Sequence, residues 1–145
     1  MRRLFLIFAT GVVLGASTTS VAFGARVAGL TASPSTIDFH TQRVGTENYK
    51  RIKITNSSAS DVAVLVEGGL PDDFGFGLMP GSTCPVLARE IVARGESCYA
   101  VVRFSPTEFF ADWNQEGSLI ATGADPATGT VIATLNIPVL GTGKL

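Results

Sequence analysis

The sequence contains little charge, a single histidine and only two cysteines among its 145 residues. Charged residues make up 16% of the chain, below the roughly one quarter that is usual in soluble domains. Long stretches of Glu, Lys and Leu with a helical period are also missing, whereas Val, Ile, Thr, Gly and Phe are plentiful. This composition favours strands and turns over helices.

The chain has no dense cluster of basic residues. Its formal net charge is -1, and the charge becomes more negative when Arg2 and Arg3 are removed with the leader described below. A surface that binds a nucleic acid needs clustered Lys and Arg to displace counterions from the phosphates. The only concentration is Lys50, Arg51 and Lys53, which fits the solvated face of a strand. We therefore expect no nucleic-acid partner.

The residue types that carry catalysis or bind metals are sparse. His40 follows a strand pattern and has no nucleophile motif near it, so we interpret it as an exposed loop histidine. Asp72 and Asp73 lie in a Gly- and Pro-containing segment that is typical of a solvated turn. Cys84 and Cys98 lack the further ligands that a metal site needs. The sequence predicts no catalytic residue, no metal and no cofactor, and hence no enzyme.

The amino terminus has the three parts of a secretory signal peptide. Arg2 and Arg3 give a positive start, and an apolar run follows over residues 4–14. Ala22 and Gly24 then occupy the small-residue positions that precede a cleavage site. The arginine pair also resembles a twin-arginine signal, but the very short positive region favours general secretion.

These features divide the chain into a signal-peptide helix over 1–24 and one mature domain over 25–145. The apolar run is too short to cross a bilayer core, which takes roughly 20 apolar residues. We therefore expect cleavage, a soluble product with no stable membrane insertion, and a location in the periplasm or outside the cell.

The two cysteines predict a disulfide. Cys84 and Cys98 both lie in the mature part, and export places them in an oxidising compartment where thiols pair. Closing a loop of this length stabilises a domain by about 3 kcal/mol in the chain-entropy model. The bridge would hold the loop from Gly81 to Ala93 against a strand.

From Leu30 to Thr142 the sequence reads as short alternating runs separated by Gly, Pro, Asn and Ser. Such spacing is typical of a β-sandwich or barrel. We expect a first strand over residues 30–39 that is broken at Pro34, a short strand over residues 87–92, and a final hairpin around Asp125 and Gly129. The positions expected to point inward are Ile52, Ile54, Val62, Val64, Val66, Cys98, Ala100, Val102 and Phe104.

Several short motifs, in this order, resemble the ASH family (ASPM, SPD-2, Hydin), whose bacterial members occur in exported and surface proteins. They are residues 33–39, 44–46 and 54–57, Cys84, and residues 95–98, 102–106, 117–119 and 140–143. The resemblance spans nearly the whole mature chain. It implies an immunoglobulin-like sandwich of about seven strands, similar to major sperm protein and periplasmic pilus chaperone domains. It also implies that the cysteines pair, and it brings no catalytic motif.

One segment departs from that family pattern. Between Pro106 and Gly117, where a small connection is usual, the chain carries the large aromatics Phe109, Phe110 and Trp113. Three exposed aromatics would form an anchor for a partner. The simpler interpretation is that they cap the end of the sandwich, since aromatic rings bury their area when a core is near.

Taken together, these features predict a noncatalytic exported binding or scaffolding module of the cell envelope that recognises a protein or glycan. The alternative is a structural or chaperone-like assembly factor that acts by β-strand pairing. The sheet edges distinguish the two. An edge blunted by Pro or Lys favours recognition, whereas a long unprotected edge favours strand exchange.

Overall fold

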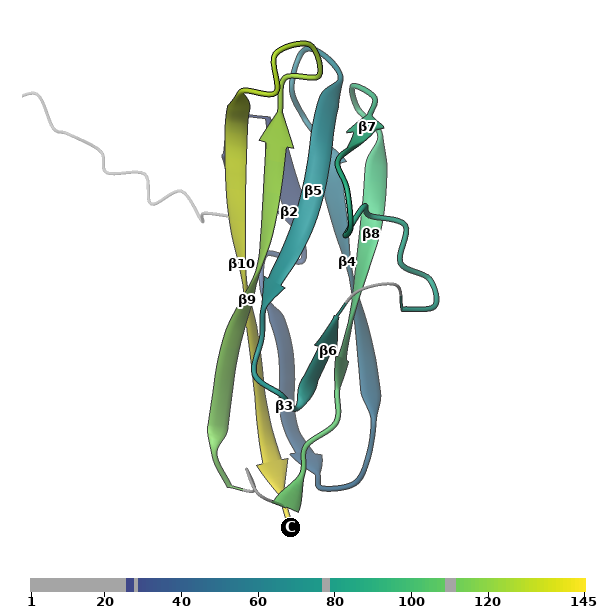
Figure 1. The fold of residues 1–145 in the computed structure, drawn as a ribbon. Coiled ribbons are helices and arrows are strands. Elements are labelled where there is room, and N and C mark those ends of the chain that lie inside the picture. The colour runs from purple at the N-terminus through teal and green to yellow at the C-terminus, as the bar shows by residue number, and fades with distance from the viewer. Residues whose placement is uncertain (1–25, 28, 77–78, 109–111) are drawn as a thin grey trace, which may run out of the picture.

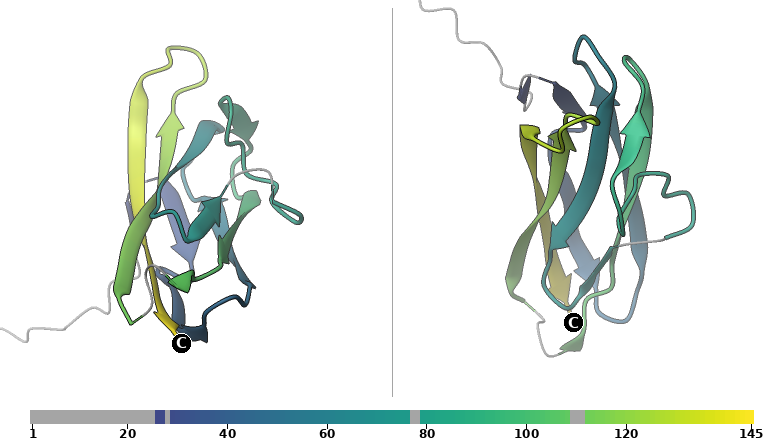
Figure 2. Two further views of the ribbon diagram at one scale, coloured as in Figure 1. Left: turned by 60° about the horizontal axis from the view of Figure 1, so that its bottom comes forward. Right: turned by 45° about the horizontal axis from the view of Figure 1, so that its top comes forward.

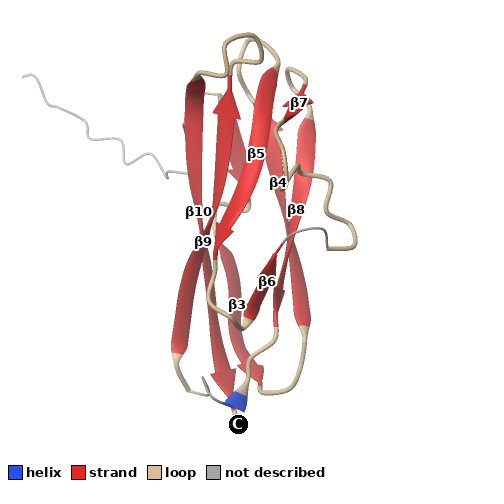
Figure 3. Ribbon diagram, viewed as in Figure 1, coloured by secondary structure: helices blue, strands red, loops and turns tan. Residues whose placement is uncertain are grey.

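The computed structural model describes residues 26–27, 29–76, 79–108 and 112–145 of the chain. These residues form ten strands in two sheets that pack face to face (Figures 1 and 2). Strands and loops make up nearly all of the described chain (Figure 3). The predicted all-β, immunoglobulin-like sandwich is confirmed. The predicted signal-peptide helix over 1–24 lies outside the described residues.

Sheet A contains five strands in the order β1-β2-β4-β8-β6, and each neighbouring pair is antiparallel. Its central pair, β4 and β8, runs from Asn48 opposite Phe104 to Thr55 opposite Ser97. The strands are β1 (Arg26–Val27), β2 (Leu30–Ser33), β4 (Asn48–Asn56), β6 (Phe74–Phe76) and β8 (Ser97–Phe104).

Sheet B also contains five strands, in the order β3-β10-β9-β5-β7. The edge strand β3 is parallel to β10, and the other pairs are antiparallel. The predicted last hairpin is β9 and β10, and Asp125 and Gly129 lie in its turn, as expected. The strands are β3 (Ile37–Arg43), β5 (Val62–Gly69), β7 (Glu90–Val92), β9 (Asn114–Ala124) and β10 (Val131–Lys144).

The structure contains more strands than the seven expected. The predicted broken first strand divides at Pro34 into β2, which joins sheet A, and β3, which joins sheet B. Seven strands have four residues or more, and the three short strands β1, β6 and β7 bring the number to ten. The predicted strand over residues 87–92 covers only Glu90–Val92, and Leu87 lies exposed in the loop before it.

The core lies between the two sheets and consists of the alternate side chains that the sequence predicts to point inward. Three phenylalanines gather within it, with the rings of Phe74 and Phe104 4.6 Å apart and that of Phe39 within 6 Å of both. All nine predicted inward positions are buried, namely Ile52, Ile54, Val62, Val64, Val66, Cys98, Ala100, Val102 and Phe104.

The predicted disulfide is present. Cys84 and Cys98 are bonded at 2.02 Å and both are buried, so the bridge fastens the loop before β7 to the start of β8. Among the residues that the structure describes, no helix is long and apolar enough to cross a membrane.

Candidate binding site at the sheet edges and on the outer face of sheet A

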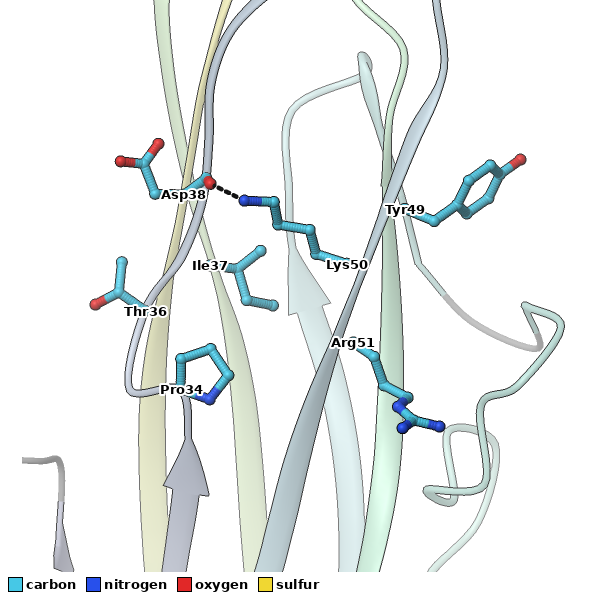
Figure 4. A pocket seen from close by; sticks show the side chains of 7 residues that line it. All are labelled: Pro34, Thr36, Ile37, Asp38, Tyr49, Lys50 and Arg51. Atoms are coloured by element: carbon cyan, nitrogen blue, oxygen red, sulfur yellow. Dashed lines mark hydrogen bonds between the residues drawn. The ribbon is translucent and has the colours of Figure 1, made fainter.

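The two sheets meet at an open seam where the chain passes from β2 to β3. Within β4 only residues 53–56 pair with β2, and residues 49–51 lie across a pocket from the edge strand β3 of the other sheet. The pocket has a volume of about 500 Å³ (Figure 4). It is lined by Pro34, Thr36, Ile37, Asp38, Tyr49, Lys50 and Arg51.

Lys50 spans this seam. Its Nζ donates a hydrogen bond of 2.5 Å to the backbone carbonyl of Asp38 in β3, as Figure 4 shows. The same ammonium lies 5.7 Å from the centre of the Phe39 ring, within range of a cation–π contact. The bond occupies a carbonyl that points out from the sheet edge, so Lys50 caps a group that an added strand would use.

A β-bulge interrupts the edge strand next to this cap. The pairing of β3 with β10 shifts between Asp38 and Thr41, and His40 between them has a φ of 55°. The Asp38 carboxylate accepts the backbone N–H of His40 at 2.7 Å and lies 3.0 Å from its Nδ1. A bulge of this kind bends the strand and disturbs the ladder, so the edge offers no regular template for another strand.

His40 is exposed, as expected, although it lies within β3 and not in a loop. Within the described residues, His, Cys, Asp and Glu side chains form no group of three or more that could hold a metal ion.

The loop that the disulfide holds covers part of the β8 edge of sheet A and part of the β5 edge of sheet B. The backbone N–H groups of Thr83 and Cys84 donate to the Tyr99 carbonyl of β8 at 2.7 and 2.9 Å. The Thr83 hydroxyl accepts the Tyr99 N–H at 2.9 Å. In sheet B, the Val66 N–H of β5 donates to the Pro85 carbonyl at 2.9 Å. The loop thereby satisfies edge groups of both sheets.

The outer face of sheet A carries aromatic and basic side chains. Tyr49, Arg51 and Lys53 alternate along β4 and point away from the core, and they lie opposite Arg103, Val101 and Tyr99 of β8. In Figure 4, Tyr49 and Arg51 lie on one side of the β4 ribbon and Lys50 on the other. We call Tyr49, Arg51, Lys53, Tyr99 and Arg103 the basic face.

Contacts within the basic face fix several of its side chains. The Arg51 guanidinium carbon lies 4.3 Å from the centre of the Tyr99 ring. Arg103 forms an ion pair of 3.1 Å with Glu47. The Tyr49 hydroxyl donates to the same carboxylate at 2.9 Å, and this bond raises the pKa of Tyr49 above its ordinary value. These contacts hold Arg51 and Arg103 along the sheet surface.

Of the three aromatics proposed as a partner contact, only Trp113 falls within the described residues. Its side chain is 65% exposed, beside the start of β9. Phe109 and Phe110 lie outside the described residues, so a partner contact at this segment stays a prediction.

The expectation that Asp73 lies in a solvated turn is wrong. Asp73 is 3% exposed, and its carboxylate accepts hydrogen bonds from Gln115 Nε2 at 2.7 Å and from the N–H and hydroxyl of Thr107 at 3.1 and 2.9 Å. Asp72 beside it is exposed, as expected. The partners of Asp73 lie more than 30 residues later in the chain, so its own neighbours in sequence give no signal of burial.

Asn56, the last residue of β4, is a second buried polar residue. It is fully buried, and its side-chain amide donates to the carbonyls of Ser60 and Val92, both at 2.9 Å. Its side-chain oxygen accepts from the N–H and hydroxyl of Ser58. Asn56 therefore joins the end of β4 to the end of β7.

Sequence comparison finds no matching protein family and no match among curated proteins. Solved structures, however, share the fold. The ASH/PapD-like domain 7 of human CEP192 is similar with a TM-score of 0.59 at 11% identity, over 88% of this chain and 95% of that one. WR4, a Caenorhabditis elegans MSP family member, gives a TM-score of 0.54 at 12% identity, over 80% and 100%. The Escherichia coli chaperone DraB gives 0.53 at 12% identity, over 80% of this chain and 55% of that chain.

These similarities support the fold that the ASH resemblance implied, the immunoglobulin-like sandwich of PapD-like and MSP domains. Identities this low show the fold alone, because one sandwich architecture carries many unrelated functions. Membership of an exported ASH type stays a prediction.

Proposed function

We propose that this chain is a noncatalytic recognition module of the cell envelope that binds a partner through side chains on the faces of its sheets. The observation that carries the proposal is the capped edge of β3. This is the longest edge strand among the described residues, and Lys50, the Asp38 carboxylate and the bulge at His40 all obstruct it.

The other edge strands are also poor sites for strand addition, which agrees with recognition through the faces of the sheets. The strands β1, β6 and β7, which end the other sides of the sheets, have three residues or fewer. Strand addition gains its affinity from a row of backbone hydrogen bonds, and so short an edge offers few of them. A partner that reads side chains needs no free edge.

An exported location agrees with the disulfide. Structural disulfides form and persist in oxidising compartments, and the buried Cys84–Cys98 bridge belongs to that class. Together with the predicted leader over 1–24, it supports a site of action in the periplasm or outside the cell.

The second candidate is an assembly factor that pairs strands. One observation favours it: an open pocket lies between β3 and residues 49–51 of β4, at the seam between the two sheets. DraB, which is a chaperone, has a similar fold. In that case the Lys50 cap would have to release before a strand could pair.

Crosslinking of the full-length chain in its native envelope, followed by mass spectrometry and glycan analysis, distinguishes the two. Recognition predicts one defined partner, joined through residues on a sheet face. Crosslinks that run along β3 or a ladder of linked copies would contradict it. Turnover of a substrate by the purified protein would contradict both.

Removing the edge cap gives a matched test. In Lys50→Ala the Asp38 carbonyl loses its hydrogen-bond partner, and the edge becomes more open to pairing. We expect more self-association by size-exclusion chromatography and unchanged partner capture, with Lys53→Ala, an exposed lysine of the same strand, as the control for self-association. If Lys50→Ala raises partner capture severalfold, strand pairing is the function.

A further inference from the structure

We propose that the basic face of sheet A binds a polysaccharide that carries carboxylates. The inference rests on the recognition function proposed above and names the chemical class of the partner. It depends on three properties of the face: unpaired positive charge, a regular spacing of cations, and a surface of hydroxyls and aromatic rings without aliphatic anchors.

The first property is positive charge without an internal partner. Arg51 and Lys53 are both exposed, and among the described residues neither lies within 4.0 Å of a carboxylate. By contrast, Arg103 is paired with Glu47. The whole chain has a net charge of -1, so two free cations side by side form a local positive patch on an acidic protein. Such a patch attracts an anionic partner and repels a basic one.

The second property is geometry. Arg51 and Lys53 occupy consecutive outward positions of β4, which places their Cα atoms about 7 Å apart along the strand. The Tyr99 ring lies 4.3 Å beneath the Arg51 guanidinium carbon and supports that group on the sheet. A guanidinium held in this way presents its N–H groups as a fork, which matches a carboxylate. Cations in a row on a rigid strand suit a linear polymer with repeating acidic groups.

The third property favours a sugar over an acidic polypeptide. The buried centre of a protein interface is apolar and is depleted of Lys. On the outward positions of β2, β4 and β8, the only aliphatic side chain is Val101, which is 5% exposed. The others are cations, tyrosines and hydroxyls, and they include Thr55 and Ser97, whose hydroxyls lie 2.8 Å apart. The Tyr49 side chain, 50% exposed, offers a ring face on which the C–H face of a pyranose can stack.

The test measures binding of the purified exported protein to immobilised polygalacturonate. Methyl-esterified polygalacturonate is the uncharged control, and poly-L-glutamate is the acidic polypeptide. We expect binding to polygalacturonate only, weakened by added salt. In the double variant Arg51→Gln/Lys53→Gln the affinity should fall about tenfold, which is the loss of two exposed charge contacts. Thermal unfolding by circular dichroism verifies that each variant is folded.

Two further variants sharpen the result. Arg43→Gln/Lys144→Gln removes the same charge from exposed paired positions of sheet B, and its affinity should stay within about twofold of the wild type. Tyr49→Val keeps a strand-forming residue but removes the ring, and it should weaken polygalacturonate binding severalfold.

Several outcomes would overturn the proposal. The first is binding to poly-L-glutamate as strong as that to polygalacturonate, which would indicate an acidic polypeptide or charge alone. The second is a loss of affinity in the sheet B variant equal to that in the Arg51→Gln/Lys53→Gln variant. The third is no binding to any of the probes. If the Arg51→Gln/Lys53→Gln variant still captures the partner in the envelope, the basic face is not its site and the recognition function stands. If neither protein captures a partner, the recognition function fails as well.

Discussion

Gly141 in β10 packs directly against the ring of Phe104 in the opposite sheet. A Cβ at this position would lie 2.8 and 2.9 Å from ring atoms Cε1 and Cζ of Phe104. That ring is fully buried and stacks on Phe74, so it has little room to shift. The absence of a side chain at Gly141 is therefore what lets the two sheets approach each other here.

We predict that Gly141→Ala lowers the free energy of unfolding by about 1–3 kcal/mol, the usual cost of overpacking a core. Gly69→Ala is the control, because a Cβ there would meet its nearest atoms at an ordinary 3.9 Å. Urea denaturation of both variants measures the difference. Equal stability of the two would show that the Phe104 ring moves freely.

Asp73 connects segments that are distant in the chain. Its carboxylate binds Thr107 and Gln115, which flank the connection between β8 and β9, and its carbonyl accepts the Ser105 N–H at 2.8 Å. Without the carboxylate, the buried Gln115 amide group loses this partner, and an unpaired buried polar group is costly.

We expect Asp73→Ala to lower the free energy of unfolding by about 2–3 kcal/mol, since three hydrogen bonds to a buried charged group are lost. Asp72→Ala, at the exposed neighbour, should change it by no more than about 0.5 kcal/mol. Chemical denaturation at pH 7 gives both values. A neutral Asp73→Ala would show that solvent replaces these bonds.

At the scale of elements, the disulfide fastens a long loop to a strand. Residues 79–89 lie between β6 and β7 without a strand of their own, yet they cover edge groups of β8 and β5. The bridge holds that cover in place at Cys84 and Cys98, which are 14 positions apart. Loss of the bridge should therefore loosen this edge before the central strands.

We predict that Cys84→Ala/Cys98→Ala lowers the free energy of unfolding by about 3 kcal/mol, the chain-entropy value for a loop of this length. Hydrogen exchange should become faster at Thr83 and Val66, whose N–H groups bond across that cover. Dithiothreitol should destabilise the wild type and leave the double variant unchanged. Protection of both amides in the variant would contradict this account.

The edge strand β3 shows how elements limit what the fold can do. Its alternation of Ile37 and Phe39 toward the core is regular, and the bulge at His40 then breaks it. The bulge lies in the pairing of β3 with β10, whereas Lys50 hydrogen-bonds the Asp38 carbonyl from β4 of the other sheet. A regular edge of this length would invite pairing between copies, and these features oppose it.

At the scale of the whole molecule, the export prediction concerns where the protein folds. A leader over 1–24 that is removed would leave a mature chain beginning near Ala25, just before β1 at Arg26–Val27. Cleavage at that point leaves all ten strands of the described sandwich intact.

We predict that the full-length chain, expressed in a bacterial host, yields a periplasmic product without residues 1–24 and with no titratable thiol. A version that starts at Ala25 and stays in the cytoplasm should keep its two thiols reduced. Intact-mass spectrometry and thiol titration check both. Retention of the leader in the mature product would contradict export by cleavage.

The sequence by itself determined which side chains enter the core. Ile52 and Ile54 alternate with the exposed Arg51 and Lys53, and a strand turns alternate side chains to opposite faces wherever it lies. The hairpin turn follows from the residues around Asp125 alone. The disulfide follows from the cysteine count, because the chain has only two cysteines to pair. Such properties need no knowledge of which strands become neighbours.

Only the tertiary structure decided what surrounds the polar residues. Three contacts join residues that are 12 or more positions apart in the chain. They are the hydrogen bond from Gln115 to the buried Asp73, the bond from Lys50 to the Asp38 carbonyl, and the contact of Arg51 with the Tyr99 ring. Their partners come together only once the strands have their order and register. The residues next to a polar side chain in the sequence do not indicate which distant residue it will contact. The candidate binding surface could therefore be identified only from the arrangement of the strands in the sheets.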